Sequence, residues 1–391
     1  MMLRRLTDPA YGRARSLAAA MLAAALSGCG FGLLMPLVAL NLEMMTGSAV
    51  VVGTNAAAAA LSTMVATPFI PALLSRFRAR GAMVVSLVLS AGVLVLFPLM
   101  RDVTLWFVLR FAVGVTITVV FVGSETWINQ LARPERRASL LAVYATVLSG
   151  GFAVGGLLLA TLGASGWLPW LVGGAIYLFG AIPILLLRGP DLMAPDMKEA
   201  GPRAMLAAVR LAPIAILAGL LFGALETGIF SLLPVYAERL GLSVGTVGLL
   251  AFAGAAGGIA LQIPIGQLAD RQGRAATLLQ VAAISVALPL VLLWVGAFKP
   301  LLFPLIFVYG GIAGAFYTLG LAMMGERLTP SMFAMGNAAF IFSYGAGQLA
   351  GPPVSGTAME LMNPGGLMIA FAATAALYLA IAGLVFTRRR H

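Results

Sequence analysis

The chain has 391 residues, of which 61% are hydrophobic and 9% charged, with a mean hydropathy of +1.03 and a net charge of +11. This composition excludes an ordinary soluble globular domain. A basic excess also suits a nucleic-acid-binding protein, but the positive charge lies in short connections between apolar segments, so we expect no nucleic-acid partner.

Apolar segments follow one another along the whole chain. Each approaches the roughly 20 residues that a membrane-spanning helix needs, and none alternates apolar and polar residues as a membrane barrel strand does. We therefore predict an all-α integral membrane protein with twelve spans, at residues 17–41, 49–74, 82–100, 104–129, 138–162, 167–187, 211–236, 244–268, 276–297, 301–325, 334–359 and 366–386.

The Lys and Arg residues fall in alternate connections between these segments. Twenty of the 24 lie on one side, whereas Arg101, Arg239 and Lys299 lie on the other and Arg110 lies inside a span. Because positive charge is retained in the cytoplasm, we expect both termini there, in a multi-pass protein of the inner membrane. The bilayer itself, with anionic lipids at the cytoplasmic face, is an expected partner.

Chemistry that needs metals or reactive side chains has little support. The chain has one cysteine, Cys29, and one histidine, its last residue. We expect no metal site, no cofactor and no internal disulfide. Since the spans contain no nucleophile–base constellation and no phosphate-binding G-x-x-x-x-G-K-[ST] loop, we do not expect an enzyme.

The second half of the sequence repeats the first at an offset of 196. Matching residues include Gly151 with Gly347 and Gly155 with Gly351. A polar stretch near the midpoint separates the halves, so the predicted organisation is a six-helix bundle at 1–187, a cytoplasmic linker at 188–210 and a second bundle at 211–391. The third span of each triplet is nearly pure hydrocarbon and is predicted to face lipid, while the others surround a cavity.

Several motifs resemble those of the major facilitator superfamily. The connection between the eighth and ninth spans reads Gly266-Gln267-Leu268-Ala269-Asp270-Arg271-Gln272-Gly273-Arg274, similar to the signature G-x-L-a-D-r-x-G-r. Arg110 with Gly114 resembles the R-x-x-x-G element. Gly347-x-x-x-Gly351-Pro352 resembles a helix-packing element that antiporters carry in span 5, although span 5 of this chain lacks the proline. The surroundings of Glu125 resemble the YcaD-like branch.

This resemblance implies two pseudo-symmetric bundles and a gating network at the cytoplasmic side. Asp270 and Arg274 are four residues apart and are predicted to pair locally, Glu326 to complete the network, and Gly266 to permit close helix approach. The first half has Pro71, Ser75, Arg78 and Gln130 at the positions of Gly266, Asp270, Gly273 and Glu326. We therefore predict that only the second half retains this network.

Three charges lie within spans, where each has an energetic cost that calls for a role. Glu226 is about midway along its span, so it is either a proton-coupling or substrate-binding group, or a hydrogen-bonded link between two helices. Arg110 has a role in proton or substrate handling by resemblance, or else makes a structural ion pair or carbonyl contacts. Glu125 either lines the inner vestibule or braces the positive loop. Further cavity candidates are Asn55, Tyr144, Phe230, Tyr317, Tyr344 and Gln348.

The predicted function is secondary transport of a small organic solute by a monomer working through alternating access. Proton coupling through Glu226, helped by Arg110, is favoured as the energy source, and export is favoured over uptake on resemblance. A lipid or lysolipid flippase on the same scaffold remains an alternative. A transport-inactive membrane sensor or assembly factor is another.

Overall fold

The computed structural model describes residues 9–133, 136–187, 206, 209–296 and 298–388. Its regular elements in these ranges are all helical, and no strand occurs among them. Eleven candidate membrane spans are long and apolar enough to cross a bilayer. The chain is therefore a helical multi-pass membrane protein. Most of the predicted 188–210 linker lies outside the described residues.

The chain forms two compact units. Unit 1 comprises 1–37 and 61–197, and unit 2 comprises 38–60 and 198–391. The first helix, α2 (Pro9–Thr46), and the second, α3 (Ala49–Ala66), therefore contribute residues to both. The remaining helices of unit 1 are α4 (Ile70–Arg76), α5 (Ala79–Leu99), α6 (Val103–Leu131), α7 (Arg137–Leu162) and α8 (Leu168–Leu186), with a short 3-10 turn, η1 (Thr67–Phe69), before α4.

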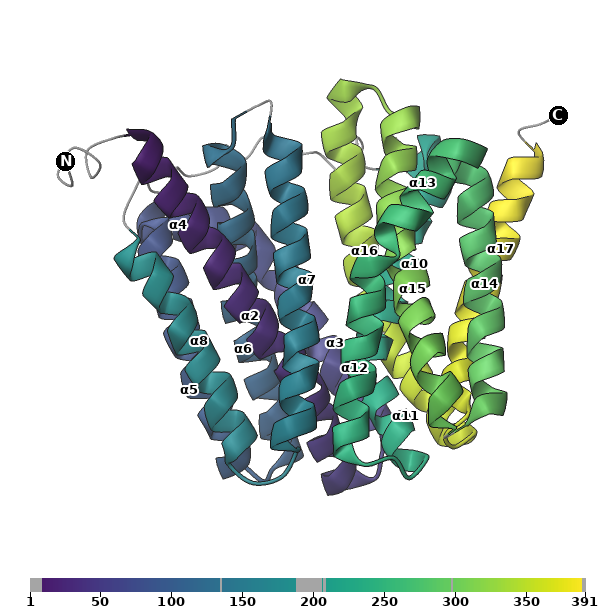
Figure 1. Ribbon diagram of the computed structural model, residues 1–391, viewed down its shortest axis with the longest axis horizontal. Coiled ribbons are helices and arrows are strands. Elements are labelled where there is room, and N and C mark those ends of the chain that lie inside the picture. Colours follow the sequence, from purple (N-terminus) through teal and green to yellow (C-terminus); the bar gives the residue numbers. More distant parts are fainter. Residues whose placement is uncertain (1–8, 134–135, 188–205, 207–208, 297, 389–391) are drawn as a thin grey trace. The chain divides into compact units, whose positions relative to one another are not determined.

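Unit 2 contains the helices of the second sequence half (Figure 1). These are α10 (Pro213–Ser231), α11 (Leu233–Arg239), α12 (Val244–Ala260), α13 (Gln262–Gln272), α14 (Arg274–Val295), α15 (Lys299–Arg327), α16 (Pro330–Leu361) and α17 (Gly366–Arg388). Within this unit α10 packs against α16, α12 against α15, and α14 against α17.

Prolines divide three predicted spans into shorter helices. The spans expected at 49–74, 211–236 and 244–268 each contain an interruption, at Thr67–Phe69, Leu232 and Leu261 respectively. Pro68, Pro234 and Pro264 lie within or directly after these breaks. Proline lacks the backbone N–H that a continuous helix needs, so each break follows from the local sequence.

The repeated glycines occupy equivalent helix crossings in the two units. A Cβ on Gly151 or Gly155 of α7 would overlap the backbone of α2, at Ala25 and at Leu33 respectively. A Cβ on Gly347 or Gly351 of α16 would overlap the backbone of α10. Close backbone approach through small residues is a common mode of helix packing in membranes. The offset of 196 therefore reflects one packing arrangement used twice.

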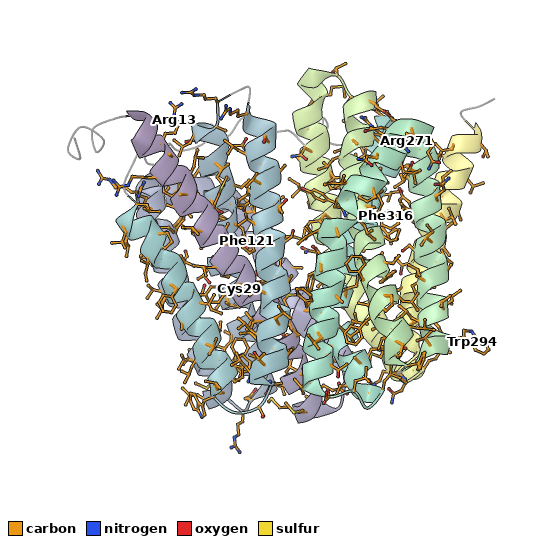
Figure 2. All side chains as sticks on the ribbon, viewed as in Figure 1. Arg13, Cys29, Phe121, Arg271, Trp294 and Phe316 are labelled. Carbon is orange, nitrogen blue, oxygen red and sulfur yellow. The ribbon has the colours of Figure 1, made fainter. Side chains whose placement is uncertain are left out.

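The nearly pure hydrocarbon helices expose apolar side chains. Phe179 on α8 is 58% exposed, and Trp294 on α14 is 90% exposed and projects away from its helix (Figure 2). α5 packs on α8, as α14 packs on α17. Such surfaces are what a helix facing acyl chains requires, because lipid solvates apolar groups and offers polar groups no partner.

Candidate functional site: an acid–aromatic cluster and two charged helix ends

The crossing of α10 and α16 brings together residues far apart in the sequence. Gly223 makes this crossing tight, because a Cβ there would overlap the backbone carbonyl of Tyr344. Gly351 has the same effect from the other helix, where a Cβ would lie 2.5 Å from the Cα of Ala224. Because the two backbones are in contact at Gly223, Glu226, about one turn later on α10, lies opposite Tyr344 and Gln348 of α16.

Glu226 is held by hydrogen bonds to neutral side chains. The Tyr344 hydroxyl donates to Glu226 Oε2 at 2.5 Å, and Gln348 Nε2 donates to the Tyr344 hydroxyl oxygen at 2.7 Å. All three side chains are half-buried. In the part of the chain that the structure describes, no Lys or Arg pairs with Glu226. A carboxyl group in this setting is free to gain or lose a proton without breaking an ion pair.

Aromatic rings adjoin the acid. Phe222, one turn before Glu226, stacks on Tyr344 with centroids 5.3 Å apart and an interplanar angle of 19°. Tyr317 on α15 lies 5.4 Å from Phe222 and 5.4 Å from Phe340. Tyr317 is 38% exposed and Phe230 is half-buried. Partly exposed aromatic surface next to a few polar groups is the usual lining of a small-molecule site.

The signature loop forms a different contact from the one its spacing predicts. Arg274 Nη1 pairs with Glu326 Oε1 at 3.0 Å and donates to the Ala322 carbonyl at 2.7 Å, so the loop is tied to the end of α15. The predicted local pair of Asp270 with Arg274 is not formed among the described residues. Gly273, at φ +93°, ends α13 before Arg274 begins α14. The two side chains therefore do not share one helix, and spacing by four does not bring them together.

The other loop positions can be placed as well. Within unit 2 a Cβ at Gly266 would meet no atom within 4 Å, so the predicted close helix approach does not occur inside this unit. Arg271 lies exposed near the end of α13 (Figure 2). Gly273 allows a backbone conformation that side chains with a Cβ rarely adopt.

The equivalent loop of unit 1 keeps the backbone but changes the contacts. Arg78, at the Gly273 position, also has a positive φ, of 56°. Arg80 then donates to the Ile184 carbonyl at 2.9 Å and to the Ser16 hydroxyl at 2.9 Å, and its guanidinium lies 4.6 Å from the Trp127 ring centroid. In unit 1 the loop is thus held by backbone carbonyl and aromatic partners of Arg80. In unit 2 the equivalent loop is held by the ion pair of Arg274 with Glu326.

The remaining predicted residues are distributed over both units. In unit 1 Arg110 is 1% exposed, Glu125 is exposed on α6, and the buried Tyr144 hydroxyl lies 3.3 Å from the Ser124 hydroxyl. Asn55 is 1% exposed in the α3 segment of unit 2. Pro352 packs there too, because a Cβ on Gly53 would overlap its carbonyl. Arg110, Glu125 and Tyr144 thus belong to unit 1, whereas Asn55 belongs to unit 2, as Glu226 does.

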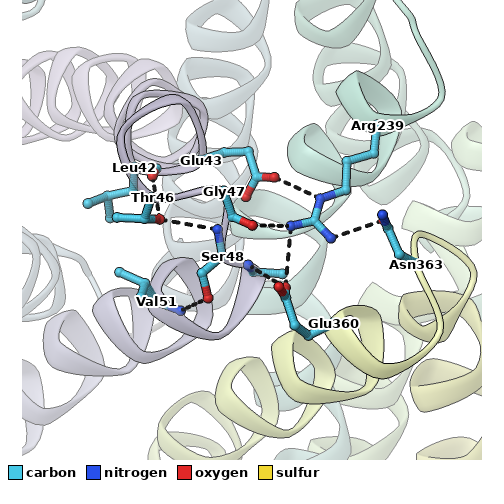
Figure 3. A network of polar contacts seen from close by, with 10 residues as sticks. Leu42, Glu43, Thr46, Gly47, Ser48, Val51, Arg239, Glu360 and Asn363 are labelled. Carbon is cyan, nitrogen blue, oxygen red and sulfur yellow. Dashed lines mark hydrogen bonds and ion pairs between the residues drawn. The ribbon is translucent and has the colours of Figure 1, made fainter.

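A charged network that sequence reasoning missed lies at the other end of unit 2 from the signature loop (Figures 1 and 3). Arg239, at the end of α11, pairs with Glu43 on α2 at 2.7 Å and with Glu360 on α16 at 3.4 Å. It also donates to the Gly47 carbonyl at 3.1 Å and to Asn363 Oδ1 at 3.0 Å. We call these five residues the Arg239 network.

The network docks the connection between α2 and α3 onto α11 and α16. The Ala49 N–H donates to Glu360 Oε2 at 3.0 Å, and a Cβ on Gly356 would overlap the Ala49 carbonyl. Burial lowers the pKa of Arg239, but hydrogen bonding to Glu43 and the charges of Glu43 and Glu360 outweigh it and raise that pKa. The neighbouring Glu238 has a raised pKa because of burial and the charge of Glu43. The sequence signal for the Arg239 network is the position of its charged residues, which lie beside two loops.

Comparisons with known proteins agree with this architecture. The family model described as Major Facilitator Superfamily matches residues 20–312 and residues 216–391. The chain is 27% identical over 355 residues to the MFS-type transporter YfkF of Bacillus subtilis (strain 168), covering 89% of each. It is 27% identical over 276 residues to the MFS-type transporter YcaD of Shigella flexneri, covering 70% of each.

Solved transporter structures share the fold. The nucleoside transporter NupG aligns with a TM-score of 0.74 at 13% identity, over 96% of this chain and 99% of its own. A bacterial homologue of the human lysosomal transporter Spinster, in an inward-facing and unoccupied conformation, aligns with a TM-score of 0.72 at 16% identity, over 95% of each chain.

Proposed function

Because the chain belongs to the Major Facilitator Superfamily, near the YcaD-like branch, we propose that it moves a small organic solute across the inner membrane by proton-coupled alternating access. Membrane transport itself follows from the family. Twelve spans, cytoplasmic termini, a monomeric state and the direction of export are parts of the proposal. The alternate distribution of Lys and Arg supports the orientation.

The observation that carries the coupling proposal is the Glu226–Tyr344–Gln348 chain of hydrogen bonds. A half-buried carboxyl in a membrane helix, bonded only to neutral groups among the described residues, is costly to ionise and cheap to protonate. Water or substrate that reaches it changes that balance. Glu226 can therefore bind a proton from one side of the membrane and release it to the other.

The aromatic surface beside Glu226 supports an organic solute. Phe222, Tyr317 and Tyr344 form one group of adjacent rings, and the Tyr344 hydroxyl contacts the carboxyl. A ligand with an apolar body would bury those faces, and a polar group on it would compete with Tyr344 for the acid. An inorganic ion would make no use of the rings.

Two charged contacts at opposite ends of unit 2 support a two-state cycle. Arg274 with Glu326 holds the end at α13, and the Arg239 network holds the end at α11. We propose that each contact separates when its end opens, so that each contact biases the equilibrium between access states. We propose the first as the inner latch and the second as the outer latch. Coupling roles for Arg110 and Glu125 stay predictions.

The experiment begins by finding a ligand. A thermal-shift screen of the purified protein against a compound library identifies ligands, because a specific ligand stabilises the folded state by mass action. Hits are then tested in proteoliposomes, with and without an imposed pH gradient. The comparison variants are Glu226→Gln and Tyr344→Phe, with Asp102→Asn, at an exposed acid, as the control.

The expected result separates coupling from binding. Wild type and Asp102→Asn should accumulate the compound against its gradient when protons flow the other way. Glu226→Gln should still exchange labelled for unlabelled compound but lose that uphill accumulation. Equal accumulation by Glu226→Gln would remove this residue from the mechanism, and absence of flux for every stabilising compound would remove transport.

A further inference from the structure

Unit 1 contains a buried guanidinium that has no ionic partner among the described residues. Arg110 on α6 is 1% exposed, and its Nη2 donates to the Met35 thioether sulfur at 2.9 Å, while its Cζ lies 5.7 Å from the Phe31 ring centroid. Its Nε and Nη1 have no acceptor among the described residues. A thioether and a ring face are weak neutral partners, and they leave the full positive charge uncompensated.

The described carboxylates of unit 1 do not compensate this charge. Asp102 precedes Arg110 by eight residues, about 12 Å along the helix axis, and already accepts hydrogen bonds from the Thr104 and Leu105 N–H groups. Glu125 follows by fifteen residues, about 22 Å away, and is exposed. Within the described ranges Arg110 forms no ion pair.

Further unsatisfied hydroxyl groups lie on or against α2, the helix whose Met35 and Phe31 contact Arg110. Tyr177 on α8 is fully buried, and its hydroxyl has no partner among the described residues. Its ring fills the space left by Gly30, where a Cβ would lie 2.6 Å from it. Ser27, one turn before Phe31 on α2, is also buried with an unpartnered hydroxyl.

We propose that Arg110 and Tyr177 form a binding site for a small monovalent anion, with Ser27 as a further donor. The ligand chemistry is that of chloride or of the carboxylate group of an organic compound. A fixed cation plus two hydroxyl donors, with no acid among the described neighbours, is matched by an anion. Water would satisfy hydrogen bonds but would leave the charge unbalanced.

Binding can be measured on the whole purified protein without knowing what it transports. Cys29 is free and 7% exposed, so a thiol-reactive dye reports unfolding as this residue becomes accessible. Unfolding is followed while sodium isethionate, a bulky salt, is replaced by sodium chloride or sodium formate at constant ionic strength. The variants are Arg110→Gln and Tyr177→Phe, with Arg101→Gln, at an exposed arginine, as the control.

Chloride, formate or both should raise the melting temperature of the wild type saturably, by on the order of 5 °C at a hundredfold excess over the dissociation constant. A response to formate alone would identify a carboxylate group as the ligand, and a response to both would leave a shared anion site. Arg110→Gln should abolish the shift, Tyr177→Phe should weaken the affinity several-fold, and Arg101→Gln should retain the shift.

The proposal is overturned if no anion stabilises the wild type, if all salts act equally, or if Tyr177→Phe responds like the wild type. The Tyr177→Phe result decides the matter even if Arg110→Gln does not fold. The inference is independent of the proposed proton coupling. Anion binding without flux would remove the transport proposal alone, whereas proton-driven flux without an anion response would remove this one alone.

Discussion

Replacing Arg239 with glutamine should release the docked connection between α2 and α3. The guanidinium is the centre of the Arg239 network and contacts Glu43, Gly47, Glu360 and Asn363. Without it, Glu43, which is 11% exposed in the intact network, loses its cation, and its Oε2 already lacks a partner among the described residues. The docked state therefore loses free energy relative to the undocked one, in which Glu43 is hydrated.

The size of the effect follows from burial. Breaking a buried ion pair costs about 3–5 kcal/mol, whereas an exposed pair contributes about 0–1 kcal/mol. Arg239 and Glu43 are both 11% exposed, but Glu360 is 41% exposed, so part of the network is screened by solvent. We expect an intermediate loss of about 2 kcal/mol. This corresponds to an increase of about 30-fold in the undocking equilibrium constant.

A buried thiol on α3 measures that equilibrium. Val52 is 1% exposed and lies in the first turn of α3, directly after the docked connection. In a Cys29→Ser background, Val52→Cys should therefore react with a membrane-impermeant maleimide only after undocking. When closing is faster than labelling, the rate follows the open population. Arg239→Gln should raise the labelling rate by about 30-fold, and adding Glu43→Gln to it should raise the rate much less than Glu43→Gln does alone.

Arg101→Gln supplies the control, because Arg101 is an exposed arginine predicted on the same side of the membrane. It should leave the labelling rate within about twofold of the parent, as expected for a surface charge. If Arg239→Gln labels no faster than Arg101→Gln, the network does not hold the outer end closed.

Three further predictions concern stability, measured by thermal unfolding of the purified variants. Gly223→Ala should destabilise by about 1–3 kcal/mol, because its Cβ would overlap the Tyr344 carbonyl. The control Gly92→Ala, which has open space around it, should be neutral or stabilise by up to about 1 kcal/mol. Equal effects of the two substitutions would refute the close crossing of α10 and α16. Arg78→Gly should stabilise by about 1 kcal/mol, because glycine removes the strain of a positive φ. Arg78→Lys keeps a Cβ and should not stabilise. A gain in stability in both variants would show that the strain at φ is not the cause. Glu238 has a raised folded-state pKa, so its protonated form favours folding at low pH and that contribution is lost as pH rises through the folded pKa. Glu238→Gln should therefore be more stable than the wild type at pH 8 but not below about pH 4, and a gain that does not depend on pH would contradict this reasoning.

Much of the fold follows from the sequence because membrane helices are determined locally. Runs of apolar residues and the distribution of Lys and Arg predict helical spans, and the superfamily resemblance is confirmed by the family match. The glycine offset of 196 predicted a duplication, and Gly151 and Gly347 occupy equivalent crossings. Proline breaks such as the one at Leu232 were also readable from Pro234, but the predicted spans ignored them.

The polar contacts could not be derived in the same way. Glu226 and Tyr344 were both candidates by their polarity and position, yet they are 118 residues apart and only the α10–α16 crossing joins them. The Arg239–Glu43 pair spans 196 residues for the same reason. Asp270 and Arg274 do not pair because Gly273 changes the direction of the backbone between them. The spacing rule assumes one continuous helix, and this assumption does not hold here.

Uphill flux with and without the Glu226 carboxyl tests the proton-coupling proposal most directly. In proteoliposomes loaded with a stabilising compound, an imposed pH gradient should drive its net movement against its concentration gradient in the wild type. Glu226→Gln should reduce that movement to the level of facilitated exchange. If the glutamine variant concentrates the compound as well as the wild type at every imposed gradient, the proton does not pass through Glu226.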